Sequence, residues 1–66
     1  MTKEEAIEAM KQGKKVTHSY YTEDEWMTSN PEGDVYTFDD GVKFDSVKFW
    51  TLRFHKSWDE GWKIID

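Results

Sequence analysis

The fold of this chain depends on the stretch 35-VYTFDDGVKF-44, in which two short alternating segments flank an Asp-Asp-Gly turn signal. A two-residue turn would put Tyr36 and Phe38 on one side of the ribbon and Val42 and Phe44 on the other. A three-residue loop instead pairs Phe38 with Val42 and Tyr36 with Phe44. All four apolar side chains then share one side, which we expect to face the core. The sequence therefore predicts a β-hairpin with a type I turn, whose glycine takes the left-handed position of a G1 bulge.

A helix is predicted upstream of this hairpin, at the beginning of the chain. Thr2 and Glu5 have the spacing of a capping box, in which each side chain satisfies a backbone N–H group near the other. Gly13 follows the helical pattern and is expected to end it, because glycine adopts the left-handed conformation at low cost. The apolar stripe of this helix consists of Ala6, Ile7, Ala9 and Met10.

Strands are predicted on both sides of the hairpin. Residues 15–21 alternate and are rich in β-branched and aromatic side chains; 26–28 and 62–65 are shorter strand candidates. We expect the last of these to lie between two neighbours in the sheet. The segment 45–54 fits a strand as well as a helix, but Asp45 followed by serine resembles a helix start, so a short helix is favoured.

Together these elements predict an α+β fold. The N-terminal helix packs on a small antiparallel SH3-like β-roll of four to five strands, with a short inserted helix. We expect residues 1–66 to form a single domain, because a chain of this length holds one core.

Composition narrows the class of protein. The chain has no cysteine, 35% charged residues and a net charge of −5, which favours a cytoplasmic protein and disfavours a nucleic-acid binder. Its beginning does not resemble a signal peptide, and no apolar run approaches a membrane span. Residues 23–45 hold eight acidic residues and one lysine, a net charge of −7. This segment is interpreted either as a solvated hairpin or as an acidic surface that meets a basic partner.

Catalytic and metal-binding patterns are weak. A catalytic pair would need His18 and His55 together beside a nucleophile or carboxylate. His18 is instead expected to be packed or hydrogen-bonded within a strand. The Asp-Asp-Gly loop lacks the oxygen spacing and closing glutamate of a calcium loop. We therefore expect no enzyme activity, no catalytic residue, no metal and no cofactor.

Aromatic residues make up 17% of the chain, which is more ring area than a single short helix covers. Tryptophan and tyrosine tips tend to end at a surface or an interface, so one or two of these rings are expected to form a binding platform. The candidate ligand-binding residues are Tyr20, Tyr21, Trp50, Arg53 and Lys15.

A resemblance adds to this reading. The chain opens with 5-EAIEAMKQGKKV-16 before an aromatic strand and closes with 58-WDEGWKI-64. In these two segments it resembles the phage anti-Thoeris family, which sequesters cyclic ADP-ribose signals. The resemblance implies a small antiparallel β fold, a homo-oligomer and a nucleotide pocket at a subunit interface. The middle departs from the family, because 45-DSV-47 stands where the family has its Trp-x-Pro-Ser segment.

Two functions follow as expectations. The first is a non-enzymatic phage or prophage accessory protein that counters host defence by binding a small nucleotide signal in the cytoplasm of an infected or lysogenic bacterium. The alternative is an acidic inhibitor module that docks on a basic surface of a host protein. The residues expected to make that contact are Asp34, Asp39 and Asp40.

Overall fold

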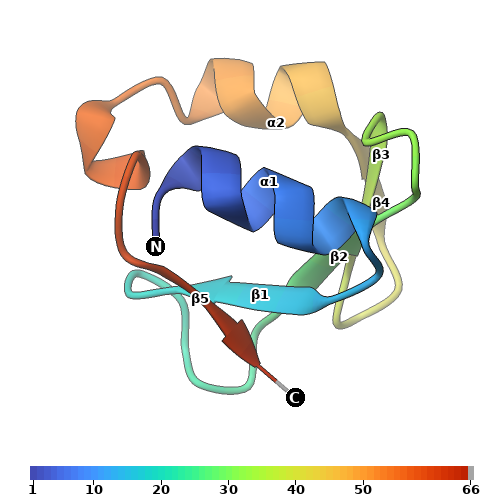
Figure 1. Ribbon diagram of the computed structural model, residues 1–66, viewed down its shortest axis with the longest axis horizontal. Coiled ribbons are helices and arrows are strands. Elements are labelled where there is room, and N and C mark those ends of the chain that lie inside the picture. The colour runs from blue at the N-terminus through green and yellow to red at the C-terminus, as the bar shows by residue number, and fades with distance from the viewer. Residues whose placement is uncertain (66) are drawn as a thin grey trace.

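The computed structural model describes residues 1–65, and within them the predicted α+β fold is confirmed (Figure 1). Five antiparallel strands form one sheet in the order β4-β3-β2-β1-β5. The strand order does not test the finer expectation of an SH3-like roll, which stays a prediction. In chain order the elements are α1 (Lys3–Lys11), β1 (Lys15–His18), β2 (Met27–Ser29), β3 (Val35–Phe38), β4 (Lys43–Asp45), α2 (Ser46–Leu52), the 3-10 turn η1 (Lys56–Trp58) and β5 (Trp62–Ile65).

The predicted hairpin register is confirmed. Tyr36 pairs with Phe44, and the Phe38 N–H group donates to the Val42 carbonyl oxygen over 2.9 Å across a three-residue loop. Gly41 has a φ of +87°, which is the left-handed conformation that the turn requires. The expectation that all four apolar side chains enter the core is wrong for Val42, which is 51% exposed. Its place at the end of the hairpin puts it beyond the helices that cover the other three.

Both helices begin where the sequence indicates. Thr2 and Glu5 form the capping box of α1, and the Asp45 carboxylate accepts from the Lys48 N–H group to begin α2. The segment 45–54 is therefore a helix up to Leu52. α1 packs against β1, β2 and β5, while α2 packs against β4. No helix within residues 1–65 is long and apolar enough to cross a membrane.

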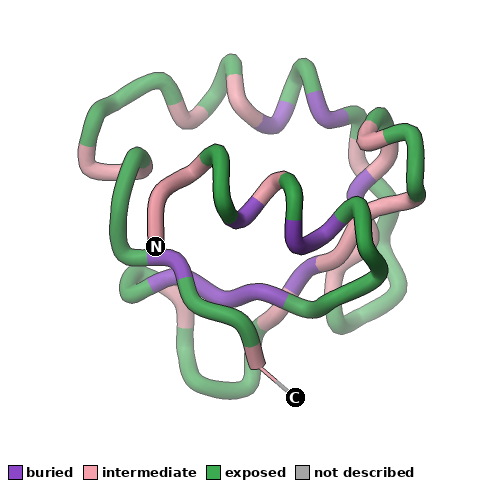
Figure 2. Tube along the Cα trace, viewed as in Figure 1, coloured by how far each residue is buried: buried purple, intermediate pink, exposed green. Residues whose placement is uncertain are grey.

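The core lies between the two helices and one side of the sheet (Figure 2). Phe49 of α2 is fully buried, with its ring centroid 5.3 Å from that of Tyr36 and 4.8 Å from that of Trp50. The Trp50 Nε1–H group donates to the Tyr36 hydroxyl over 2.8 Å and so ties the helix to the sheet. The buried hydrophobic residues are Ala6, Ala9, Met10, Val16, Met27, Tyr36, Phe49 and Trp62.

The outer side of α2 is different, because apolar side chains there remain in solvent. Val47 is 72% exposed, Leu52 is 68% exposed and Phe54, just past the helix, is 87% exposed. Figure 2 shows exposed positions alternating with buried ones along this helix. The inner side of α2 is buried through Phe49. Within residues 1–65 no helix or strand covers the outer row formed by Val47, Leu52 and Phe54.

Two expected strand features are wrong. The first strand ends at His18 rather than Tyr21, because the Tyr21 N–H group donates to the His18 carbonyl and closes a turn. The Tyr20 N–H group also donates to His18 Nδ1 over 3.1 Å, so local side-chain bonding competes with the sheet. The last strand, β5, pairs only with β1 among the described residues and lies at the edge of the sheet.

Gly61 provides a test of how tightly β5 meets β1. At this residue φ is +89°, and an added Cβ would lie 2.8 Å from Ser19 Oγ and 3.0 Å from His18 Nε2. Gly13 has nearly the same φ, +87°, but nothing within 4 Å of an added Cβ. Gly13→Ala should therefore cost only the left-handed conformation, about 1–2 kcal/mol of unfolding free energy. Gly61→Ala should cost about 1–3 kcal/mol more, because the added methyl group is also overpacked. Urea unfolding followed by tryptophan fluorescence measures both, and equal losses would contradict the crowding.

Tyr36 provides a test of the core under alkaline conditions. Burial raises the pKa of its hydroxyl above the usual 10, and the hydrogen bond from Trp50 offsets part of that rise. Because the folded state disfavours the phenolate, this contribution to stability is complete below pH 10 and is lost as the pH rises through the folded pKa. Tyr36→Phe keeps the ring without the ionisable group, so its unfolding free energy should fall less steeply above pH 10 than that of the wild type. Parallel pH profiles would show that the Tyr36 hydroxyl is not the group responsible.

Candidate functional site

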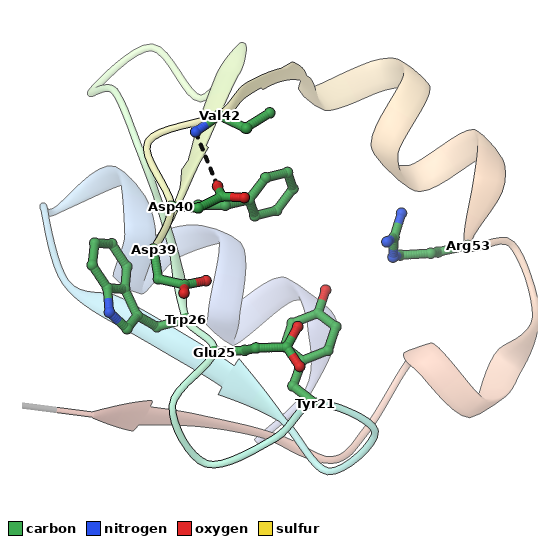
Figure 3. A pocket seen from close by; sticks show the side chains of 8 residues that line it. Tyr21, Glu25, Trp26, Asp39, Asp40, Val42 and Arg53 are labelled. Carbon is green, nitrogen blue, oxygen red and sulfur yellow. Dashed lines mark hydrogen bonds between the residues drawn. The ribbon is translucent and has the colours of Figure 1, made fainter.

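A pocket of about 240 Å³ opens between the hairpin loop, the segment before β2 and the end of α2 (Figure 3). Segments that are far apart in the sequence meet there. Its walls are formed by Tyr21, Glu25, Trp26, Phe38, Asp39, Asp40, Val42 and Arg53. We call it the acidic pocket, because three of these eight side chains are carboxylates and one is a guanidinium.

Local hydrogen bonds position the carboxylates. Glu25 ends a turn in which its Oε1 accepts from the Thr22 N–H group over 3.0 Å. Asp40 lies in the hairpin loop, and its Oδ1 accepts from the Val42 N–H group over 3.0 Å, as Figure 3 shows. The two loops are joined because the Asp39 N–H group donates to a backbone carbonyl of the other segment, that of Trp26, over 3.1 Å. The carboxylates of Glu25 and Asp40 are thus held by local hydrogen bonds, and the backbone of Asp39 is held against Trp26.

Aromatic rings form the less polar walls of the acidic pocket. Tyr21, Trp26 and Phe38 are each half-buried. Burial raises the pKa of Tyr21, while the neighbouring Arg53 guanidinium offsets part of that rise. Trp26 makes a cation–π contact with Lys15, whose Nζ lies 4.3 Å from the ring centroid. The ring surface here is therefore one that attracts positive charge.

Arg53 stands across the pocket from the carboxylates (Figure 3). Its guanidinium carbon lies 4.0 Å from the Phe49 ring centroid and 5.3 Å from that of Trp58. Its Nε atom is buried and has no hydrogen-bond partner within residues 1–65. One guanidinium against three carboxylates leaves the lining negative, so the acidic pocket attracts cations and repels phosphates.

The candidate ligand residues are only partly brought together. Tyr21 and Arg53 line the acidic pocket, and Lys15 stands beside it against Trp26. Tyr20 is 62% exposed and packs elsewhere, with its ring centroid 4.9 Å from that of His18 and 5.1 Å from that of Trp58. The fifth residue, Trp50, is half-buried, packs against the core beside Phe49 and does not line the acidic pocket.

The candidate partner residues divide in a similar way. Asp39 and Asp40 line the acidic pocket, whereas Asp34 lies in the turn before β3 and accepts a hydrogen bond from the Asn30 side chain. Glu25 and Trp26 lie in the predicted acidic segment 23–45, but neither is among the individual site residues predicted from the sequence. The capping-box spacing from Thr22 to Glu25 was the available signal, since it predicts a closed turn whose end is fixed in space.

The histidines have structural contacts. His18 is 3% exposed, and because its Nδ1 accepts from Tyr20, its Nε2 must carry the proton and donate to the Glu60 carbonyl. Neither ring nitrogen of neutral His18 is then free to accept a substrate proton. His55 caps the 3-10 turn by accepting from the Ser57 N–H group. Within residues 1–65 no group of three or more histidine, aspartate or glutamate side chains is arranged to hold a metal ion.

A second pocket, of about 250 Å³, lies on the other side of the turn after β1. It shares Tyr21 with the acidic pocket and includes Thr17, whose buried Oγ1 has no hydrogen-bond partner. The charges of Glu23 and Lys63 at this pocket balance, so it lacks the excess of negative charge that lines the acidic pocket.

Comparisons with known proteins were made by family model, by sequence and by structure. No family model, no curated protein and no solved structure matches the chain significantly. The resemblance to the anti-Thoeris family therefore stays a prediction, and the candidate site rests on the geometry of the acidic pocket alone.

Proposed function

We propose that this protein is a non-enzymatic binding module whose acidic pocket docks on a basic surface of a partner protein and blocks it. The single observation that carries the proposal is that Glu25, Asp39 and Asp40 line one pocket together with three aromatic rings. Of the two functions expected from the sequence, this favours the acidic inhibitor module. As for the acidic module expected from the sequence, we also propose that the partner is a host protein in the cytoplasm of an infected or lysogenic bacterium.

Charge segregation supports this proposal. Residues 23–45 carry a net charge of −7, whereas 46–58 contain three basic residues and no acidic one. A local excess of negative charge, as in the lining of the acidic pocket, steers a basic partner toward it and raises the rate of association more than the affinity. The pocket then provides the rings that a protein contact uses as anchors.

The nucleotide-sequestering function keeps one supporting observation, which is that Tyr21 and Arg53 line the same pocket. Three carboxylates in that lining oppose a phosphate, and no opposing cations beyond Arg53 line it. A homo-oligomer with a nucleotide pocket between subunits, as the resemblance implies, would have to bring basic groups from a second copy. We therefore place this function second.

The proposal predicts that pocket carboxylates control binding to basic polypeptides. A fluorescent peptide of alternating arginine and serine should bind, and its acidic counterpart with glutamate in place of arginine should not. Replacing Asp39 and Asp40 with asparagine should weaken binding roughly 2- to 30-fold, from about 0.2–1 kcal/mol for each exposed pair. It should also slow association and reduce its dependence on salt. Fluorescence anisotropy and stopped-flow mixing at two salt concentrations measure these effects.

Asp34→Asn is the matched control, because it removes the same charge outside the pocket. It should change binding less than Asp39→Asn or Asp40→Asn does. Calorimetry with a panel of cyclic nucleotides tests the second function in parallel. Heat from a nucleotide together with no binding of the basic peptide would reverse the order of the two functions.

A further inference from the structure

We propose that the acidic pocket is the receptor for one arginine side chain of the partner. This inference rests on the proposed function and adds the chemical group that the pocket takes. The guanidinium would lie against the aromatic walls and direct its N–H groups toward the carboxylates of Glu25, Asp39 and Asp40.

The size of the pocket favours a side chain. Sites for drug-sized molecules and cofactors commonly enclose about 300–1,000 Å³. At about 240 Å³ the acidic pocket is smaller than these, and its mouth lies open to solvent between two loops. A single extended side chain can enter such a pocket while the backbone that carries it stays on the protein surface.

The chemistry of the walls favours arginine over lysine. A guanidinium is planar and stacks on rings, and it presents several N–H donors to separate carboxylates, whereas an ammonium is a strongly hydrated point charge. The protein already contains such a contact, because the Arg53 guanidinium lies 4.0 Å from the Phe49 ring centroid. Tyr21 and Phe38 offer the same kind of surface to an incoming group, whereas Lys15 Nζ already lies 4.3 Å from the ring centroid of Trp26.

The carboxylates are prepared for this contact. The bonds from Thr22 and Val42 occupy Oε1 of Glu25 and Oδ1 of Asp40, which leaves the second oxygen of each carboxylate to accept from a ligand. Because these bonds hold the side chains before binding, less conformational freedom is lost when the ligand arrives. Arg53 lies on the opposite wall and repels the positively charged guanidinium of the ligand, which is thereby directed toward the carboxylates.

Small probes test the inference separately from the whole partner. N-acetyl-L-arginine methylamide, the corresponding lysine compound and the corresponding citrulline compound are titrated into the intact protein. Citrulline has nearly the shape of arginine without its charge. The arginine probe should shift the NMR signals of the Trp26 indole N–H and of residues 38–42. The lysine probe should bind several-fold more weakly, and the citrulline probe should leave these signals unchanged.

Variants place the probe in the pocket. Asp39→Asn combined with Asp40→Asn should weaken arginine-probe binding about tenfold, whereas Asp34→Asn should change it less than twofold. Arg53→Met, which keeps the apolar stem and removes the charge, should strengthen it. The spread of the remaining NMR signals reports whether each variant is folded. Asp39 and Asp40 are exposed, so their variants keep the test valid even if Arg53→Met unfolds.

The outcomes separate this inference from the proposed function. If the basic peptide binds through Asp39 and Asp40 but the arginine probe leaves the pocket signals unchanged, the inference is overturned and the function stands. If the arginine probe binds but no basic peptide does, the proposed function fails. Equal shifts from the citrulline probe, or tighter binding of the lysine probe, would also overturn the assignment of the pocket to a guanidinium.

Discussion

The burial of Phe49 is the constraint on which both the core and the acidic pocket depend. Its ring packs against Tyr36 and Phe38 of β3, and the Arg53 guanidinium carbon lies 4.0 Å from its centroid. α2 begins directly at the end of β4, so the helix cannot shift along the sheet without moving this ring. Phe38 and Arg53 also line the pocket. Core packing therefore fixes Arg53 relative to Phe38, while the backbone hydrogen bond between Asp39 and Trp26 joins the two loops of the pocket.

The sequence predicts the features of this fold that depend on neighbouring residues. The hairpin register follows from the side-to-side alternation of Tyr36 and Phe38, and the start of α2 follows from Asp45 as an N-cap. The position of β5 could not be predicted in this way. α2 and η1 cross from β4 at one edge of the sheet to the opposite edge, where β1 has an unpaired side that β5 can join. No pattern among neighbouring residues contains that information.

The site was less predictable than the fold for the same reason. Trp50 and Tyr20 were chosen because their rings have polar tips, but a polar tip can also be satisfied inside the protein. Trp50 donates to the Tyr36 hydroxyl, so its ring belongs to the core. Glu25 and Trp26 become part of a site only because a backbone hydrogen bond brings the hairpin loop against the segment before β2. That contact joins residues more than ten positions apart, and the sequence alone does not indicate it.

The uncovered row on α2 has a consequence for how the folded protein behaves toward small apolar molecules. Val47, Leu52 and Phe54 are in solvent although the core residues of the same fold are buried. Fluorescent dyes such as ANS, which are used to detect partly folded states, bind exposed apolar surface of this kind. The native protein should therefore brighten such a dye before any unfolding begins. Unfolding is better followed by near-UV circular dichroism of Trp50, Trp58 and Trp62, whose rings pack against one another. That signal is lost only when the tertiary packing is lost.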